Sequence, residues 1–171
     1  GLTPLEGVPM GTRCGSIDPA IMPYLMGRTG MSAQEMDTYM NKKSGMLGLS
    51  GVSSDFRDLS AATKAGNERA ALARELFCYK VKQYIGAYAA SLGGVDAIVL
   101  TAGVGENDPF IREMILEGLE YLGMDMDYDY NKACPRGKEV EISKPTSKVH
   151  VYVIPTDEEM TIAHDTAALA L

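Results

Sequence analysis

Apolar residues recur at close to helical spacing in several parts of the chain. The longest predicted helix covers residues 67–92, where alanines allow close packing and Gly93-Gly94 supplies a stop. Its buried stripe is expected at Leu72, Leu76, Val81, Tyr84 and Tyr88. A second helix is predicted from the capping box of Ser32 and Glu35 to about Lys43, because the Ser32 hydroxyl and the Glu35 carboxylate satisfy backbone N–H groups reciprocally.

Three further helices are predicted from local signals. One covers residues 19–26, with Asp18 as N-cap and Pro19 at the first helical position. Another opens at Asp108-Pro109 and stops at Gly123, and the last covers residues 158–169. The inner face of the helix that begins at Asp108-Pro109 is expected to carry Ile111, Met114, Ile115, Leu119 and Leu122.

Two short apolar runs, residues 96–101 and 149–154, predict buried strands. Residues 1–18 are turn-like, residues 48–60 predict a polar Gly/Ser-rich loop, and residues 124–147 predict an irregular connection with at most one weak strand. The alternation of helices and strands indicates an α/β fold. Since stable sheets usually have about four to six strands, further strands are expected in the irregular parts or in sequence outside this chain.

The composition agrees with a cytoplasmic globular protein. The chain has 171 residues, of which 46% are hydrophobic, and no apolar run is long enough for a membrane helix. The net charge is −7, with scattered bases, so neither nucleic acid nor a membrane is expected as a partner. The three cysteines lack CxxC spacing and are expected to be buried or semi-buried free thiols, and the two histidines are expected to be structural.

Four segments carry residues that suit phosphate chemistry, and each also has a simpler structural interpretation. Arg13 lies between glycines in a loop and can neutralise a phosphoryl group or anchor its own loop. The acidic and basic groups of 53–58 can bind ribose or phosphate, or can pair with their neighbours on the surface. The glycines of 101–107 permit close approach of a nucleotide or form a tight turn. The acids of 155–159 can bind Mg²⁺ or favour a helix start.

Taken together and in order, these segments resemble the acetate kinases, within the family that also contains propionate and butyrate kinases. The resemblance rests on TPLEG (3–7), MGTRCGSIDP (10–19), GVSSDFRD (51–58), TAGVGEN (101–107) and IPTDEE (154–159). It covers essentially the whole chain. It implies a ribonuclease-H-like domain of the actin and sugar-kinase superfamily. Residues 1–171 would form most of the C-terminal, nucleotide-side domain of a two-domain kinase whose N-terminal domain is absent from this chain.

The resemblance also implies roles for individual residues. Arg13 matches the catalytic arginine that stabilises the transferring phosphoryl group, and Glu158 matches the magnesium ligand, with Glu159 as its alternative. The residues that match the nucleotide site are Asp55, Phe56, Arg57, Gly103, Val104, Gly105, Glu106 and Asn107. Two positions depart from the family pattern, because Ser16 replaces a common Asp and Asp157 replaces a common Asn.

The implied activity is that of a phosphotransferase with a carboxyl acceptor, which converts acetate and ATP into acetyl phosphate and ADP with Mg²⁺. This chain alone is expected to lack turnover, to bind ADP or ATP weakly, and to belong to a homodimer. The first alternative is a nucleotide-binding or dimerisation module without catalysis, and the second is a propionate kinase. A dinucleotide-dependent oxidoreductase is disfavoured because GVGEND has Asp108 where the GxGxxG fingerprint requires a small residue.

Overall fold

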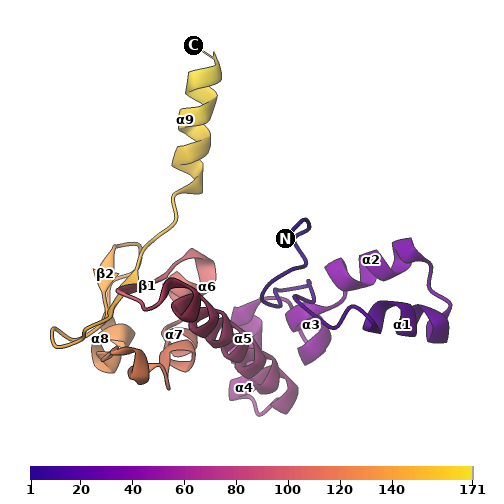
Figure 1. Cartoon of the computed structure of the whole chain (residues 1–171), viewed down its shortest axis with the longest axis horizontal. Helices are drawn as coiled ribbons and strands as arrows, with labels where there is room; N and C mark the ends of the chain where they lie inside the picture. Colours follow the sequence, from indigo (N-terminus) through magenta and orange to yellow (C-terminus); the bar gives the residue numbers. More distant parts are fainter. Residues whose placement is uncertain (171) are drawn as a thin grey trace. The chain divides into compact units, whose positions relative to one another are not determined.

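The computed structural model describes residues 1–170, and these form two compact units that divide after Tyr88. The first unit is helical, and the second contains a small sheet with helices (Figure 1). Helix α5 is continuous across the point of division. The assignment of residues 1–171 to one C-terminal domain of a longer enzyme stays a prediction.

The first unit contains helices that were in part predicted from the sequence. They are α1 (Ile21–Thr29), α2 (Ala33–Lys42), α3 (Gly45–Ser50), α4 (Phe56–Lys64) and most of α5 (Glu68–Leu92). The capping box of α2 is confirmed, since the Ser32 hydroxyl accepts from Glu35 N–H and the Glu35 carboxylate accepts from Ser32 N–H. Helix α1 begins two residues later than predicted, because Asp18 accepts from Ala20 N–H in a turn that precedes the helix.

The predicted polar loop of 48–60 is wrong over most of its length. Its first residues belong to α3 and its last residues to α4, so that only a short connection around Gly51–Asp55 is irregular. Asp55 starts α4 by accepting from Arg57 N–H at 2.7 Å, and Leu59 on the inner face of α4 is fully buried. One side-chain cap and one buried leucine therefore outweigh the low helix propensity of the Gly/Ser-rich sequence.

The extent of α5 is confirmed, but its buried stripe differs from the prediction. Leu72 and Tyr88 are 60% and 62% exposed, whereas Ala73 and Phe77 are buried. The residues of α5 with the least exposed side chains are Ala70, Ala73, Arg74, Phe77, Cys78 and Ala89. Small residues are buried because they let the helix backbone approach its neighbours, and the large side chains at 72 and 88 point outward.

The second unit is built around a three-stranded sheet of order β1-β3-β2. β1 (Ala97–Leu100) pairs in parallel with β3 (His150–Val153), and β2 (Val140–Glu141) pairs antiparallel to β3. Both strands predicted from apolar runs are confirmed, and β2 is the weak strand expected within the irregular region. Only one face is buried, since Ile98 and Leu100 are buried while Val99 is 50% exposed. The predicted burial therefore holds for one face of each strand and not for the other, because a sheet with an antiparallel strand can leave one face in solvent.

Of the two helices predicted in the second unit, the one that follows Asp108 is shorter than predicted, and the last one has nearly the predicted extent. The helices after β1 are α6 (Ala102–Asn107), α7 (Pro109–Leu116), the 3₁₀ turn η1 (Glu120–Leu122), α8 (Tyr128–Ala133) and α9 (Glu158–Ala170). The helix predicted to reach Gly123 ends at Leu116, because its C-cap Glu117 leaves the helical conformation and Gly118 takes a left-handed φ of +83°. Helix α8 was not predicted and begins where Asp127 caps Tyr130 N–H. No residue of α9 is buried.

No helix between residues 1 and 170 is long and apolar enough to cross a membrane. The expectation for cysteine is confirmed in the described chain, since Cys14, Cys78 and Cys134 are outside disulfides and are buried or half-buried. Burial raises the pKa of the Cys14 thiol.

Candidate functional site

The loop that carries Arg13 is fixed by the N-terminus of α3. Met46 N–H and Leu47 N–H, which have no partner within the helix, donate to the carbonyls of Met10 and Gly11 at 2.9 Å. Gly45 has a φ of +59°, and a β-carbon there would lie 2.6 Å from the Arg13 carbonyl oxygen. The Arg13 side chain is half-buried and donates to the Pro4 carbonyl at 3.2 Å. The TPLEG and GTR segments are therefore adjacent, and Arg13 is held on a packed loop.

Asp55, Phe56 and Arg57 lie at the start of α4 in the same unit. Arg57 donates to both carboxylate oxygens of Asp55, with its shortest contact at 2.6 Å, although the Arg57 side chain is 91% exposed. This side-chain hydrogen bond lowers the pKa of Asp55 to about 2. Phe56 packs edge-on against Phe77 with ring centroids 4.7 Å apart. The simpler interpretation, in which Asp55 and Arg57 form an ion pair with each other, is thus present in the structure. A nucleotide contact of these residues stays a prediction.

The departure at Ser16 has a local structural role. Its hydroxyl accepts from Gly7 N–H at 2.9 Å and lies 3.2 Å from the Tyr84 hydroxyl of α5. Together these groups line a shallow hollow of about 180 Å³ with Lys80, Gln83 and Ala87. Ser16 therefore joins the two N-terminal loop segments, which an aspartate at that position could do through the same Gly7 N–H.

In the second unit, the predicted nucleotide turn is a short helix, α6, directly after β1. Ala102 enters it with a φ of +59°, the sole left-handed non-glycine residue of the described chain. A β-carbon on Gly105 would lie 3.2 Å from the Leu100 carbonyl carbon, so that Gly105 is needed for packing against the strand end. A β-carbon on Gly103 would meet nothing within 4 Å, and the exposed backbone there leaves room for a ligand. Val104 is half-buried, and Asn107 donates back to the Gly103 carbonyl at 3.0 Å.

The predicted metal segment follows β3 and leads into α9. Asp157 accepts from Met160 N–H at 3.1 Å, which is an N-cap that Asn would provide equally well. Glu158 and Glu159 are exposed, and no hydrogen bond or ion pair is found for their carboxylates within the described chain. No cluster of three or more possible metal-binding side chains occurs in residues 1–170. A site with one or two free carboxylates fits Mg²⁺ bound together with nucleotide phosphates, where water and phosphate oxygens complete the shell.

The fold brings these two segments together at one edge of the sheet. β1 and β3 run in parallel, so that α6 and the 154–158 segment both leave from carboxyl ends, and Ile154 N–H donates to the Leu100 carbonyl at 3.0 Å. The Glu106 carboxylate then accepts from the Thr156 N–H at 2.9 Å and from the Thr156 hydroxyl at 3.1 Å. Ligands of open α/β sheets bind at this edge.

A buried arginine that the sequence analysis missed supports this turn. Arg112 of α7 is only 2% exposed, and it donates to the carbonyls of Gly105 and Glu106 at 3.0 Å. Its other donors reach the Asn131 side chain, the Asn131 carbonyl and the Cys134 sulfur. The available signal was a charged residue directly after Ile111 on the apolar face of the predicted helix.

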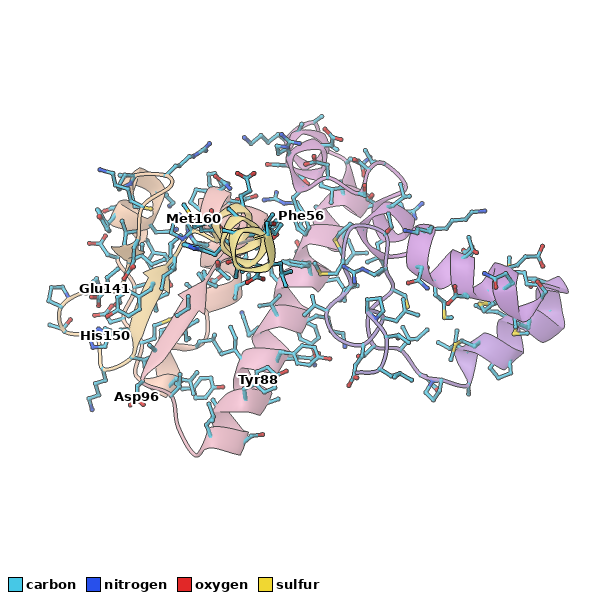
Figure 2. All side chains as sticks on the ribbon, turned by 90° about the horizontal axis from the view of Figure 1, so that it is seen from above. Phe56, Tyr88, Asp96, Glu141, His150 and Met160 are labelled. Carbon is cyan, nitrogen blue, oxygen red and sulfur yellow. The ribbon has the colours of Figure 1, made fainter. Side chains whose placement is uncertain are left out.

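A structural role is found for His150, whereas the structure gives no such support for His164. His150 of β3 lies beside Glu141 of β2, with Nδ1 and Oε1 2.7 Å apart (Figure 2). This interaction lowers the pKa of Glu141, and the Ser143 hydroxyl, 2.7 Å from the same oxygen, lowers it further. The pair ties β2 to β3. His164 lies on α9 and is exposed.

Comparison with known proteins gives consistent matches along this chain. The model of the acetokinase family matches residues 1–164. The acetate kinase of Methanosarcina acetivorans is 59% identical over 166 residues, which are 97% of this chain and 40% of the relative. The acetate kinase of Treponema denticola is 57% identical over 169 residues, which are 99% of this chain and 42% of the relative. The chain thus spans about two fifths of the length of these relatives.

Solved structures agree in fold. The crystal structure of Porphyromonas gingivalis acetate kinase superposes with a TM-score of 0.93 at 50% identity, covering 100% of this chain and 43% of that one. A propionate kinase from Francisella tularensis gives a TM-score of 0.86 at 39% identity, covering 95% of this chain and 41% of that one. The expected α/β class, with the fold of the actin and sugar-kinase superfamily, is confirmed.

Proposed function

Because the chain belongs to the acetokinase family, we propose that an intact enzyme containing it phosphorylates acetate with ATP, and that this chain provides the adenine-nucleotide side. A carboxylate oxygen of acetate attacks the γ-phosphorus of ATP, and the bond from that phosphorus to the β–γ bridging oxygen breaks. ADP leaves with the electron pair, and acetyl phosphate forms. The reaction is reversible.

One observation carries the nucleotide assignment. The open backbone at Gly103 and the free carboxylates of Glu158 and Glu159 follow neighbouring parallel strands at the same sheet edge. Glu158 would hold Mg²⁺, with Glu159 as the alternative, and the ion would offset phosphate charge when bound. The backbone of Gly103, Val104, Gly105, Glu106 and Asn107 would contact the nucleotide. A nucleotide contact is also proposed for Asp55, Phe56 and Arg57, on the basis of their motif.

Arg13 is assigned to the charge that develops on the transferring phosphoryl group. A guanidinium matches two phosphate oxygens at once, and an arginine in this role contributes about a thousandfold or more to the rate. The packing of its loop against α3 supports this assignment, since a fixed backbone reduces the entropy lost when the side chain engages.

The test is a titration of the 171-residue chain with ADP in the presence of Mg²⁺, combined with a hydroxamate assay for acetyl phosphate. We expect weak ADP binding and no turnover, since two carboxylates and one arginine do not make a complete phosphoryl-transfer site. Absence of any ADP binding would reject the nucleotide assignment. Robust acetyl phosphate formation by this chain alone would reject the proposal that it provides only the nucleotide side of the active site.

Two other functions are supported by specific observations. Similarity to the Francisella tularensis propionate kinase supports a slightly longer carboxylate as acceptor, although the identity is lower than to the Porphyromonas gingivalis acetate kinase. Exposed Leu72 and Tyr79 on α5 support a homodimer, in which the chain serves as a dimerisation module. Light scattering of the chain, with Leu72→Glu as the disrupting variant, tests that association.

A further inference from the structure

Glu106 lies in the candidate nucleotide turn, but its carboxylate is directed at another segment of the chain. One oxygen, Oε1, accepts both the Thr156 N–H at 2.9 Å and the Thr156 hydroxyl at 3.1 Å. The two residues are 50 positions apart in sequence, so this contact exists only in the folded unit. Thr156 is two residues before Glu158, the candidate metal ligand.

The main chain at Glu106 is itself held from inside the unit. Arg112 Nη1 donates to the Gly105 and Glu106 carbonyls, which lie at the C-terminal end of α6 and have no helical partner. Each of the five N–H donors of Arg112 has an acceptor, and Asn131, which supplies two of them, is fully buried. Asn131 in turn donates to the Pro109 carbonyl at 2.9 Å, which anchors it to the start of α7.

These contacts form one continuous path from the interior of the unit to the segment in front of α9. Arg112 fixes the backbone of the turn, and the fixed turn aims the Glu106 carboxylate at Thr156. A charge-assisted hydrogen bond to a backbone N–H is among the stronger kinds, and here a hydroxyl adds a second donor. The Glu106 carboxylate, which already accepts two protein donors, is therefore less available to a ligand than the open backbone at Gly103.

We propose that Glu106 is a positioning residue. Its carboxylate accepts both hydrogen bonds from Thr156, a contact called the clasp below, and thereby couples the nucleotide turn to the segment that carries Glu158. The proposal rests on the proposed function for the ligands that the two segments bind. Movement of one segment is transmitted to the other through Oε1. Binding of Mg²⁺ at Glu158 consequently strengthens ADP binding at the turn through the protein, in addition to the direct attraction between the ion and the phosphates.

The first measurement tests the clasp without any ligand. Amide hydrogen exchange of the 171-residue chain, read by NMR, should show the Thr156 N–H protected in the wild type and unprotected in Glu106→Ala. Since Glu106 provides the acceptor for this exposed amide, equal exchange in the two proteins would overturn the clasp.

The second measurement tests the coupling, with ADP as the probe. The dissociation constant of ADP is measured by calorimetry with Mg²⁺ and with EDTA. The constant in EDTA divided by the constant in Mg²⁺ gives the factor by which the ion strengthens ADP binding. We expect Thr156→Val, which removes the hydroxyl donor at nearly constant shape, and Glu106→Ala to reduce this ratio by about fivefold or more. Thr156→Ser retains the hydroxyl and should restore the wild-type ratio, with all variants compared at matched thermal stability.

The possible outcomes distinguish failure of the Glu106–Thr156 coupling from failure of the proposed nucleotide-binding function. Loss of ADP binding by the same factor with and without Mg²⁺ would overturn the coupling, because it would make Glu106 a direct nucleotide contact or a purely structural residue. An unchanged ratio in both Glu106→Ala and Thr156→Val would also overturn it. A wild-type chain that binds no ADP rejects the proposed function and with it the coupling, while protection of the Thr156 amide still decides whether the clasp exists.

Discussion

Substitution of Gly45 by Ala should destabilise the first unit far more than an equivalent substitution elsewhere. The added β-carbon would lie 2.6 Å from the Arg13 carbonyl oxygen and 3.0 Å from the Arg13 nitrogen, and closer still to the Met10 carbonyl oxygen. None of these backbone atoms can rotate away. The loop of residues 10–13 must therefore retreat from the N-terminus of α3.

The cost has two parts that the structure separates. The left-handed conformation at +59° costs alanine about 1 kcal/mol or slightly more. Retreat of the loop breaks the bonds from Met46 N–H to Met10 and from Leu47 N–H to Gly11, both 2.9 Å, and each is worth about 1 kcal/mol net. The total loss of unfolding free energy is about 3 kcal/mol.

Gly30 supplies a matched control in the same unit. It also has a left-handed φ, +74°, but a β-carbon there would meet nothing within 4 Å. Gly30→Ala should therefore cost only the conformational part, about 1 kcal/mol. Urea denaturation followed by circular dichroism gives both values. If Gly45→Ala and Gly30→Ala lose the same free energy, the close approach of the Arg13 loop to α3 is wrong.

Two further predictions concern ion pairing and the buried arginine. Because the folded pKa of Asp55 is about 2 and the unfolded value about 3.9, stability from its pairing with Arg57 is complete above about pH 4 and is lost as pH falls toward 2. Asp55→Asn keeps the N-cap but should remove this dependence, as measured by denaturation at several pH values. Arg112→Ala should cost about 3 kcal/mol or more in thermal unfolding, because Asn131 and two carbonyls lose their donor. A loss below about 1 kcal/mol would contradict the bonding seen at Arg112.

Local signals were sufficient wherever a few neighbouring residues settle the backbone. The Ser32–Glu35 capping box and the Gly93-Gly94 stop fixed helix ends correctly, since both act within one turn. The apolar runs around β1 and β3 were also recognised. The prediction failed at 48–60 and at α8, because the Gly/Ser-rich or polar composition hid the local caps of Asp55 and Asp127. The buried contacts that stabilise these helices of low intrinsic propensity come from distant parts of the chain.

For the candidate site too, some features were predictable from the sequence and others depended on the tertiary structure. Arg13, Asp55, Arg57 and the 103–107 turn were identified from ordered motifs, because residue type and order along the chain are sequence properties. The sequence by itself thus determined the family, the main helices and the groups that suit phosphate chemistry. The tertiary structure decided which groups meet, because the parallel pairing of β1 and β3 places α6 beside Thr156. Hydrogen bonds such as Glu106 to Thr156, across 50 residues, depend on that pairing and leave no periodic trace in the sequence.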